Sequence, residues 1–190
     1  MTAFEHVTAL FSFVYALALT HLLARVGELV VARERVKSST LLIIAMANAV
    51  LSVFLNWLSL WDLRTIKEWD LLTITIQFVF AVVVFLLCVF VAPKVHDEGD
   101  IDLEEFYWNQ RPSIYSATLA LVLLALVANF AFLKSANAAL FLKENLVVLP
   151  MLVPPILAFS VRARWAQWVA GVGFLALNLV YAVLFCGSFK

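Results

Sequence analysis

Long, uninterrupted hydrophobic runs alternate with short polar segments along the whole chain. A helix needs about 20 mainly apolar residues to cross a hydrocarbon core of roughly 30 Å, and backbone polar groups cannot be left unbonded in lipid. The runs are continuous instead of alternating residue by residue, which excludes a transmembrane β-barrel. The pattern therefore predicts an all-α polytopic membrane protein, a six-transmembrane-helix bundle that forms a single integral membrane domain over 1–190. The predicted spans are approximately 7–31, 40–62, 71–92, 113–133, 145–161 and 166–187, and the longest connection is a polar loop at 93–112.

The composition supports a membrane protein and excludes several other classes. Hydrophobic residues make up 65% of the 190 residues and charged residues only 14%, whereas a soluble domain carries roughly 25% charged residues. The net charge is zero, so no overall field attracts nucleic acid. The start of the chain has no basic n-region and is predicted to be the first span, not a signal peptide. The two cysteines, Cys88 and Cys186, are too few for a disulfide framework and are predicted to lie near opposite ends of the bundle.

Lysine and arginine residues predict the orientation, because cytoplasmic loops carry an excess of them. Eight lie in or near the first, third and fifth loops, and five lie on the opposite side. This bias predicts both termini outside, which in a bacterial inner membrane means the periplasm. Tryptophans are expected at both interfaces. The eight basic residues are Arg25, Arg33, Arg35, Lys37, Lys94, Arg111, Arg162 and Arg164, and the five are Arg64, Lys67, Lys134, Lys143 and Lys190.

Small and polar residues recur every four positions in the first two spans, which places them on one face of each helix. Membrane helices associate through small residues, with hydroxyls and amides bonding across the contact. We therefore expect a polar seam between spans one and two, which either packs the two helices or lines a polar path. The stripe of span one is Thr8, Ser12, Ala16, Thr20 and Ala24; the stripe of span two is Ala45, Ala49, Ser52, Asn56 and Ser59, with Asn48 beside it.

Two further groups of polar residues lie within the spans. His21, Arg25 and Glu28 share one face of the first span near its cytoplasmic end, and are interpreted either as a structural charged cluster or as a proton- or ion-sensing group. Amide side chains also recur in the outer halves of four spans. Since an unpaired amide facing lipid is costly, these amides should point inward, as packing contacts or as the lining of an outward-facing vestibule. They are Asn56, Gln77, Asn129 and Asn178.

Span five contains three prolines, and an acidic segment precedes span four. Pro150, Pro154 and Pro155 predict a kinked or locally unwound span five. The acidic segment 96–108 contains Leu103, Phe106 and Tyr107 at helical spacing. It is expected to form a surface helix before span four, which Pro112 would open, and to be either a solvated connector or a binding site for a protein partner.

Motifs for catalysis and for cofactor binding are absent from the sequence. There is no GxGxxG, Walker A, HExxH, GxSxG or CxxC pattern, and only His21 among the histidines lies well inside a span. We therefore expect no catalytic residues, no metal site, no cofactor and no enzyme activity.

Two segments, FSFVYALALTHLLARVGEL at 11–29 and DLEEFYWNQRP at 102–112, are similar to small uncharacterised proteobacterial inner-membrane proteins with six helices. That resemblance implies membrane class and compartment only. Phe11, Ser12, Ala16, Ala18 and Thr20 also resemble the first helix of the endolysosomal potassium-channel family and its bacterial relatives, in which first helices line the pore. The aspartate and the upstream arginine of that family are missing here, the spacing is one residue short, and the predicted outside termini differ from its cytoplasmic ones.

Two functions follow as hypotheses. The first is a small oligomeric channel or transporter for an ion or small solute, in which Ser12, Thr20, His21, Asn48, Ser52 and Asn56 line a polar path. The second is a non-catalytic membrane subunit, such as an anchor, an assembly partner or a stress or defence effector, whose seam is helix packing. The expected partners are the lipid bilayer, further copies of the chain and, as one interpretation of the acidic loop 96–108, a protein bound there.

Overall fold

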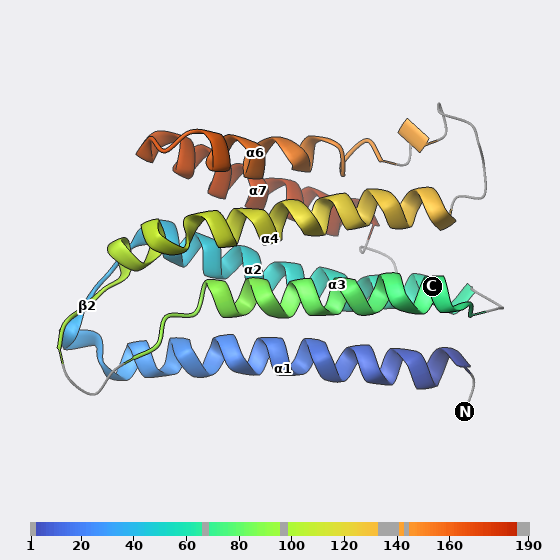
Figure 1. Cartoon of the computed structure of the whole chain (residues 1–190), viewed down its shortest axis with the longest axis horizontal. Coiled ribbons are helices and arrows are strands. Elements are labelled where there is room, and N and C mark those ends of the chain that lie inside the picture. The colour runs from blue at the N-terminus through green and yellow to red at the C-terminus, as the bar shows by residue number, and fades with distance from the viewer. Residues whose placement is uncertain (1–2, 66–68, 96–98, 133–140, 143–144, 186–190) are drawn as a thin grey trace.

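The computed structural model describes residues 3–65, 69–95, 99–132, 141–142 and 145–185, and these are largely helical (Figure 1). The helices are α1 (Ala3–Val31), α2 (Thr40–Ser59), α3 (Leu71–Phe90), α4 (Leu103–Phe132), α6 (Val153–Ser160) and α7 (Arg164–Phe185). The shorter elements are the 3-10 turns η1 (Arg33–Arg35), η2 (Leu60–Thr65) and η3 (Pro150–Leu152) and the strands β1 (Val36–Lys37) and β2 (Ile101–Asp102).

Within the described residues, five helices are long and apolar enough to cross a membrane: α1, α2, α3, α4 and α7. They correspond to the predicted spans one, two, three, four and six. The all-α prediction is confirmed.

The predicted fifth span differs from the other five. Residues 145–149 form turns, η3 follows, and α6 has only eight residues. Pro150, Pro154 and Pro155 cannot donate backbone hydrogen bonds, and three such residues within six positions disfavour a regular helix through the whole segment. The predicted unwinding of this segment is confirmed.

Helix α4 corrects the prediction of a separate surface helix. It runs without interruption from Leu103 to Phe132 and includes Pro112. The start of α4 is anchored because Leu103 and Tyr107 are buried in the bundle, not at a lipid interface. This packing offsets the roughly 3 kcal/mol that a proline costs inside a helix.

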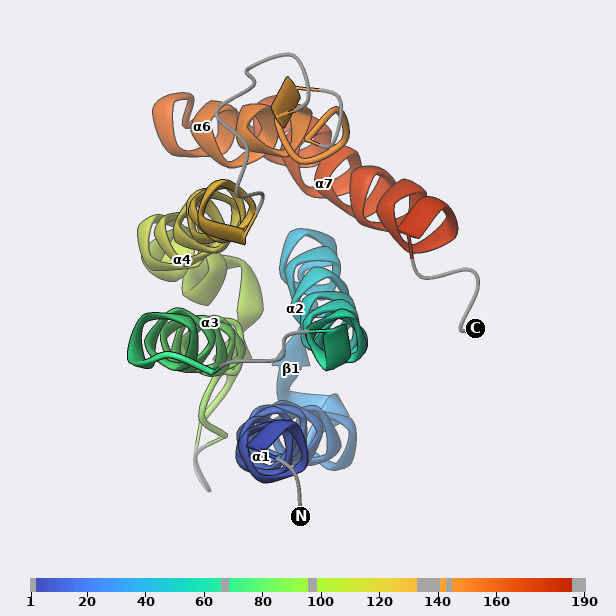
Figure 2. The same cartoon turned by 90° about the vertical axis from the view of Figure 1, so that its right-hand side faces the viewer.

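The helices lie side by side with α2 in the middle of the bundle (Figure 2). Helix α1 packs mainly against α3, α3 packs on α4, and α7 packs on α2 and α6. The buried face of α1 carries Phe11, Tyr15, Ala18 and Leu22. Cys88 is buried in α3, and Cys186 lies outside the described residues.

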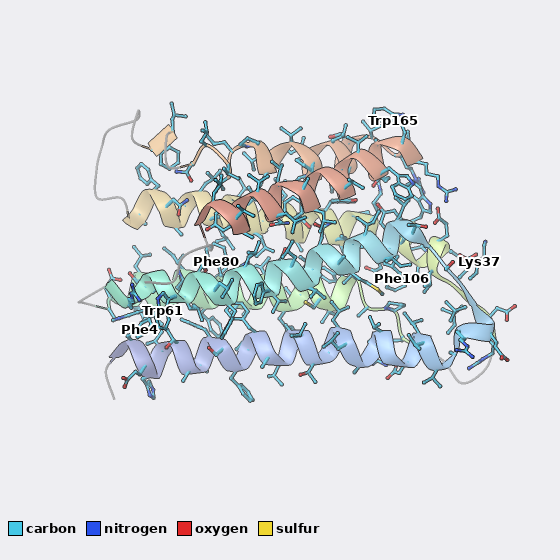
Figure 3. All side chains as sticks on the ribbon, turned by 180° about the vertical axis from the view of Figure 1, so that it is seen from behind. Phe4, Lys37, Trp61, Phe80, Phe106 and Trp165 are labelled. Carbon is cyan, nitrogen blue, oxygen red and sulfur yellow. The ribbon has the colours of Figure 1, made fainter. Side chains whose placement is uncertain are left out.

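Large apolar side chains cover the exterior of the bundle along its length (Figure 3). Leu71 is 81% exposed, Phe13 62% and Val183 75%. In water such a surface is a liability for aggregation, whereas it suits a bilayer. Trp61 and Trp165 lie at opposite ends of the bundle (Figure 3).

The first, third and fifth connections meet at one end of the molecule, and α1 begins and α7 ends at the other (Figure 1). Strand β1 pairs with β2 in parallel, with Val36 beside Ile101. Arg164, at the start of α7, reaches Glu104 of α4. We call the end that holds these contacts the clasp end.

Candidate functional site: a polar column between α2, α4 and α7

The polar stripe of α2 faces α7 and α4. Asn48 donates hydrogen bonds from Nδ2 to the carbonyl oxygens of Gly171 at 2.9 Å and Ile44 at 3.1 Å. A glycine is needed at 171, because a Cβ atom there would lie 2.9 Å from Cγ2 of Ile44. Ser52, one turn further along α2, is also buried. The stripe of α2 is therefore buried, as a packing or lining face should be.

The stripe of α1 is largely exposed, so the predicted close packing of the two stripes is wrong. Ala16 and Thr20 are exposed. Ser12 meets α2, where its hydroxyl accepts a hydrogen bond from Nε1 of Trp57 at 3.3 Å, and Thr8 and Ala16 line outer grooves between α1 and α2. The reason is the competition between the two faces of α1. The aromatic and aliphatic residues on the other face, such as Phe11, bury far more apolar area than the small residues of the stripe.

The charged cluster of α1 is separate from the polar column. His21 is half-buried beside Phe85 of α3, with ring centroids 6.2 Å apart. Arg25 and Glu28 form an ion pair within the helix at 2.7 Å, as the structural interpretation expects. The structure does not bring His21 near Asn48 or Ser52.

A cavity of about 110 Å³ lies between α2, α4, α7 and the residues before α6. We call it the vestibule. It lies near the ends of α2, α4 and α7 that are remote from the clasp end. Three of the four amides predicted to converge, Asn56, Asn129 and Asn178, line it. Gln77 is buried on α3 but is not among the lining residues. The polar residues of the lining are Ser52, Asn56, Ser59, Asn129, Asn178 and Tyr181.

The vestibule is uncharged and has one unsatisfied donor. Among the described lining residues there is no acidic or basic side chain. Asn129 donates to Oδ1 of the fully buried Asn145 at 2.6 Å, which ties the segment before η3 to α4. Asn178 Nδ2 is buried and has no hydrogen-bond partner within the described part of the chain. Since buried polar groups are almost always hydrogen-bonded, Asn178 is a lining residue with an unmet hydrogen-bonding need.

A second, smaller cavity of about 20 Å³ lies deeper in the bundle. We call it the inner cavity. Phe174 of α7 is buried and lines both cavities. The polar side chains that line the inner cavity are Asn48, Tyr115 and Thr118.

A chain of buried hydrogen bonds continues from Tyr115 toward the clasp end. The hydroxyls of Tyr115 and Tyr107 lie 3.0 Å apart, and Tyr107 donates to Oε1 of Gln167 at 3.0 Å. Gln167 in turn donates to the carbonyl oxygens of Ala158 at 3.0 Å and Val161 at 2.6 Å.

The two carbonyls at the end of α6 also accept from Arg111, at 2.7 Å and 3.4 Å. The last carbonyls of a helix have no partner within it. Arg111 and Gln167 therefore cap α6 at this end of the column.

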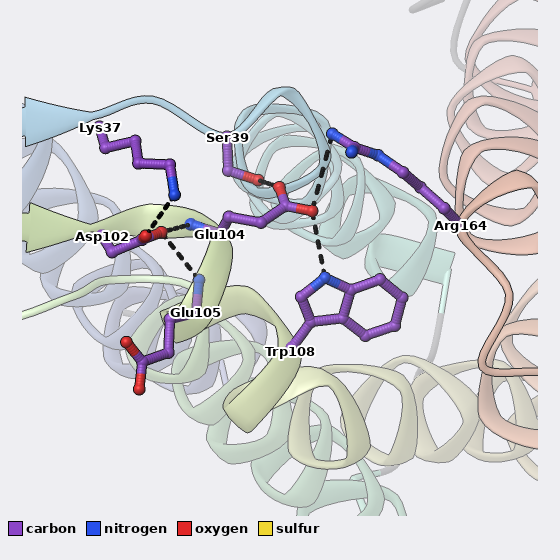
Figure 4. Close-up of polar contacts among 7 residues, drawn as sticks. All are labelled: Lys37, Ser39, Asp102, Glu104, Glu105, Trp108 and Arg164. Atoms are coloured by element: carbon purple, nitrogen blue, oxygen red, sulfur yellow. Dashed lines mark hydrogen bonds and ion pairs between the residues drawn. The ribbon is translucent and has the colours of Figure 1, made fainter.

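Side chains of three connections meet at the clasp end, where they are bonded to one another (Figure 4). Lys37 pairs with Asp102 at 2.6 Å, and Asp102 also accepts from the backbone N–H groups of Glu104 and Glu105 as the N-cap of α4. Glu104 accepts from Ser39 at 2.6 Å and from Trp108 at 3.1 Å. Arg164 lies 3.7 Å from Glu104.

The ion pair between Lys37 and Asp102 shifts the pKa of both residues. The hydrogen bond from Lys37 is the main cause that lowers the pKa of Asp102, and the same bond raises the pKa of Lys37. Asp102 and Glu104 of the acidic loop are thus engaged within the chain. Residues 96–98 of that loop lie outside the described residues.

Sequence reasoning missed Tyr107, Arg111, Tyr115 and Gln167 as members of one network. Each of these residues carries a hydrogen-bonding group and lies close to a predicted membrane boundary, which is the one signal they share. Helices α4 and α7 are far apart in the sequence, so the sequence does not reveal that both bond to the end of α6.

Two apolar grooves of about 390 and 320 Å³ run along the outside of α1 and α2 and share Ser12 and Trp57. They lie on the apolar exterior and not in the polar column. Comparisons of this chain with protein-family models, with curated proteins and with solved structures gave no match.

Proposed function

We propose that this chain is an integral membrane protein that binds a small uncharged polar solute in the vestibule and passes it along the column between α2, α4 and α7. The observation that carries the proposal is the convergence of Asn56, Asn129 and Asn178 on one cavity, where a buried amide donor has no partner among the described residues. Ligand sites are typically largely apolar cavities with a few polar groups that fix orientation. The vestibule has this composition.

The neutral lining decides against a bare ion as the solute. An ion taken from water needs opposite charges or a ring of carbonyls to replace its hydration, and the described vestibule lining has no charged group. A neutral molecule loses much less on entry. It must be able to form a hydrogen bond with the amide of Asn178.

In this proposal all six predicted spans belong to the membrane domain, with the short α6 segment packed against α4 and α7. The clasp end, with its arginines and lysines, faces the cytoplasm, because positive charge is retained there. The vestibule then opens toward the periplasmic side of a bacterial inner membrane, as do both termini.

The test is solute flux into proteoliposomes. Stopped-flow light scattering with the purified full-length chain should show faster entry of water, ammonia or another small neutral solute than empty liposomes show. Asn178→Leu should reduce that flux about tenfold. Asn109→Leu, at an exposed asparagine of α4, is the matched control and should behave as wild type. Equal rates in wild-type and empty liposomes for every solute would refute the proposal.

A second candidate is a non-catalytic membrane subunit. It is favoured by the grooves between α1 and α2 and by the exposed small residues Ala16 and Thr20, since small residues let a second helix approach closely. In that case a further copy of the chain packs on α1. Ala16→Phe should then convert an oligomer to monomers in detergent, as measured by light scattering, and Ala47→Phe on an exposed face of α2 should not.

A further inference from the structure

The inner cavity behind Phe174 has space for one small molecule. A cavity needs roughly 10–15 Å³ of probe-occupied volume to hold one water, and this one has about 20 Å³. The vestibule, at about 110 Å³, is several times larger. A solute that moves from the vestibule into the inner cavity must therefore be close to water in size.

The polar groups around the inner cavity have no hydrogen left to offer. Both amide hydrogens of Asn48 are bonded to backbone carbonyls, those of Ile44 and Gly171. The hydroxyl of Thr118 donates to the carbonyl oxygen of Ile114 at 2.9 Å.

The hydrogen of Tyr115 is assigned by elimination. A tyrosine hydroxyl has one hydrogen, and that of Tyr107 goes to Gln167. In the contact between the two tyrosines, Tyr115 must then be the donor and Tyr107 the acceptor. The hydrogen of Tyr115 consequently points along the chain toward Gln167 and away from the cavity.

The inner cavity can therefore only accept hydrogen bonds, as far as its described lining goes. Asn48 Oδ1 is buried and has no partner among the described residues, and Asn48 as a whole is only 8% exposed. The bonds of its own Nδ2 fix the orientation of the amide, so this oxygen cannot be exchanged for the nitrogen. An occupant must be a hydrogen-bond donor.

The two amides differ in what they ask of a solute. Asn48 at the inner cavity has a fixed orientation and a free acceptor, whereas Asn178 at the vestibule has a buried Nδ2 without a partner among the described residues and no bond that fixes which end of its amide faces the cavity. An acceptor-only anion cannot donate to Asn48. A neutral molecule with a single heavy atom that both donates and accepts can bond to each amide in turn.

We propose that the inner cavity and Phe174 form a selectivity filter that admits neutral hydrides of the size of water and ammonia and excludes larger neutral solutes such as urea. This inference rests on the proposed function, and it specifies the class of solute that the same column conducts. Phe174 separates the two cavities, and Asn48 selects for a donor.

The experiment compares three solutes in proteoliposomes that contain the full-length chain. Osmotic shrinkage measures water, an internal pH dye measures ammonia, and swelling in a urea gradient measures urea. Wild type should conduct water, ammonia or both, and urea no faster than empty liposomes; the first two measurements also show which hydride is preferred. Phe174→Ala should join the cavities and raise urea permeability about tenfold or more.

Filling the inner cavity supplies an independent test with less risk to folding. Ala45→Val adds two methyl groups at a residue that lines the inner cavity and leaves the bonds of Asn48 in place. It should reduce conduction of the hydrides about fivefold or more. Ala47→Val, at an exposed position of α2, is the matched control and should not.

The outcomes separate the filter from the function. If wild type conducts urea as well as water or ammonia, and Asn178→Leu blocks all three, the vestibule functions but the filter is refuted. If Ala45→Val and Phe174→Ala both leave every flux unchanged in folded protein, the filter is also refuted. If wild type conducts no solute, both the filter and the proposed function fail.

Discussion

The two ends of the polar column differ in how completely their hydrogen bonds are satisfied. At the clasp end, Gln167, Arg111 and Glu104 each bond to two or more groups from other elements. At the vestibule end, three neutral amides surround a cavity and Asn178 lacks a partner among the described residues. A fully bonded buried network rigidifies a fold, whereas a partly bonded one next to open space is suited to a ligand. This difference is the basis of the structural role of the clasp end and of the binding that we propose at the vestibule end.

The largest expected effect comes from breaking the network at the clasp end. Gln167→Leu would leave the hydroxyl of Tyr107 without its acceptor and remove two bonds to the end of α6. Buried unsatisfied groups cost about 1–3 kcal/mol each, so we expect a loss of about 2–4 kcal/mol in the free energy of unfolding. Denaturant titration in mixed micelles measures it. Asn109→Leu is the control, and an unchanged stability for Gln167→Leu would remove the structural role of this end.

The next largest effect is expected where α2 and α7 approach closely, between the clasp end and the vestibule. Gly171→Ala would place a Cβ atom 2.9 Å from Cγ2 of Ile44, and overpacking of this kind typically costs 1–3 kcal/mol. Gly173→Ala is a matched control, since its nearest neighbour would be 4.0 Å away. Ile44→Ala should largely rescue Gly171→Ala in the double variant. Equal midpoints of thermal unfolding for the two alanine variants would contradict the tight contact.

A smaller effect is expected from the pH dependence of the clasp. The pKa of Asp102 is lowered below its ordinary 3.8, so its contribution is present above that pH and is lost as the pH falls through the lowered value. The pKa of Lys37 is raised above 10.5, so its contribution persists below that pH and is lost as the pH rises through the raised value. Both groups are at the surface, where an ion pair contributes little.

Lys37→Met should consequently lower the midpoint of thermal unfolding by a few degrees at most at pH 7, and the difference from wild type should shrink below about pH 3.8. Lys94→Met, at an exposed lysine near the same end, is the control. A difference that stays constant down to pH 2 would show that the charge of Asp102 is not involved.

The smallest effect on stability is expected in the vestibule. Asn178→Leu removes a buried donor that has no partner in the described residues, so no hydrogen bond is lost. We expect the free energy of unfolding to change by less than about 0.5 kcal/mol or to rise slightly. A loss as large as that of Gln167→Leu would erase the difference between the two ends and leave Asn178 as a packing residue.

Part of the candidate site was predictable from the sequence. The depth of each amide along its span follows from counting residues, so the convergence of Asn56, Asn129 and Asn178 could be expected. The direction of each helix face could not be predicted in the same way. The stripe of α1 was expected to face α2, yet Thr20 is exposed, because bulkier residues on the opposite face pack against α3.

The sequence by itself determined the class of this protein. Its long apolar runs require helices with an apolar exterior, and its three closely spaced prolines disfavour one long helix at 145–161. The odd-numbered connections share an end because successive helices alternate in direction. These features depend only on local composition and on counting along the chain.

Only the tertiary structure decided which helices share the polar interior. The contact of Asn48 with Gly171 joins residues 123 positions apart, and the orientation of the Tyr115–Tyr107–Gln167 chain depends on where α6 ends. Packing selects one arrangement among many that bury similar amounts of apolar surface. That choice depends on the shapes of side chains that are far apart in sequence, and it placed the column between α2, α4 and α7.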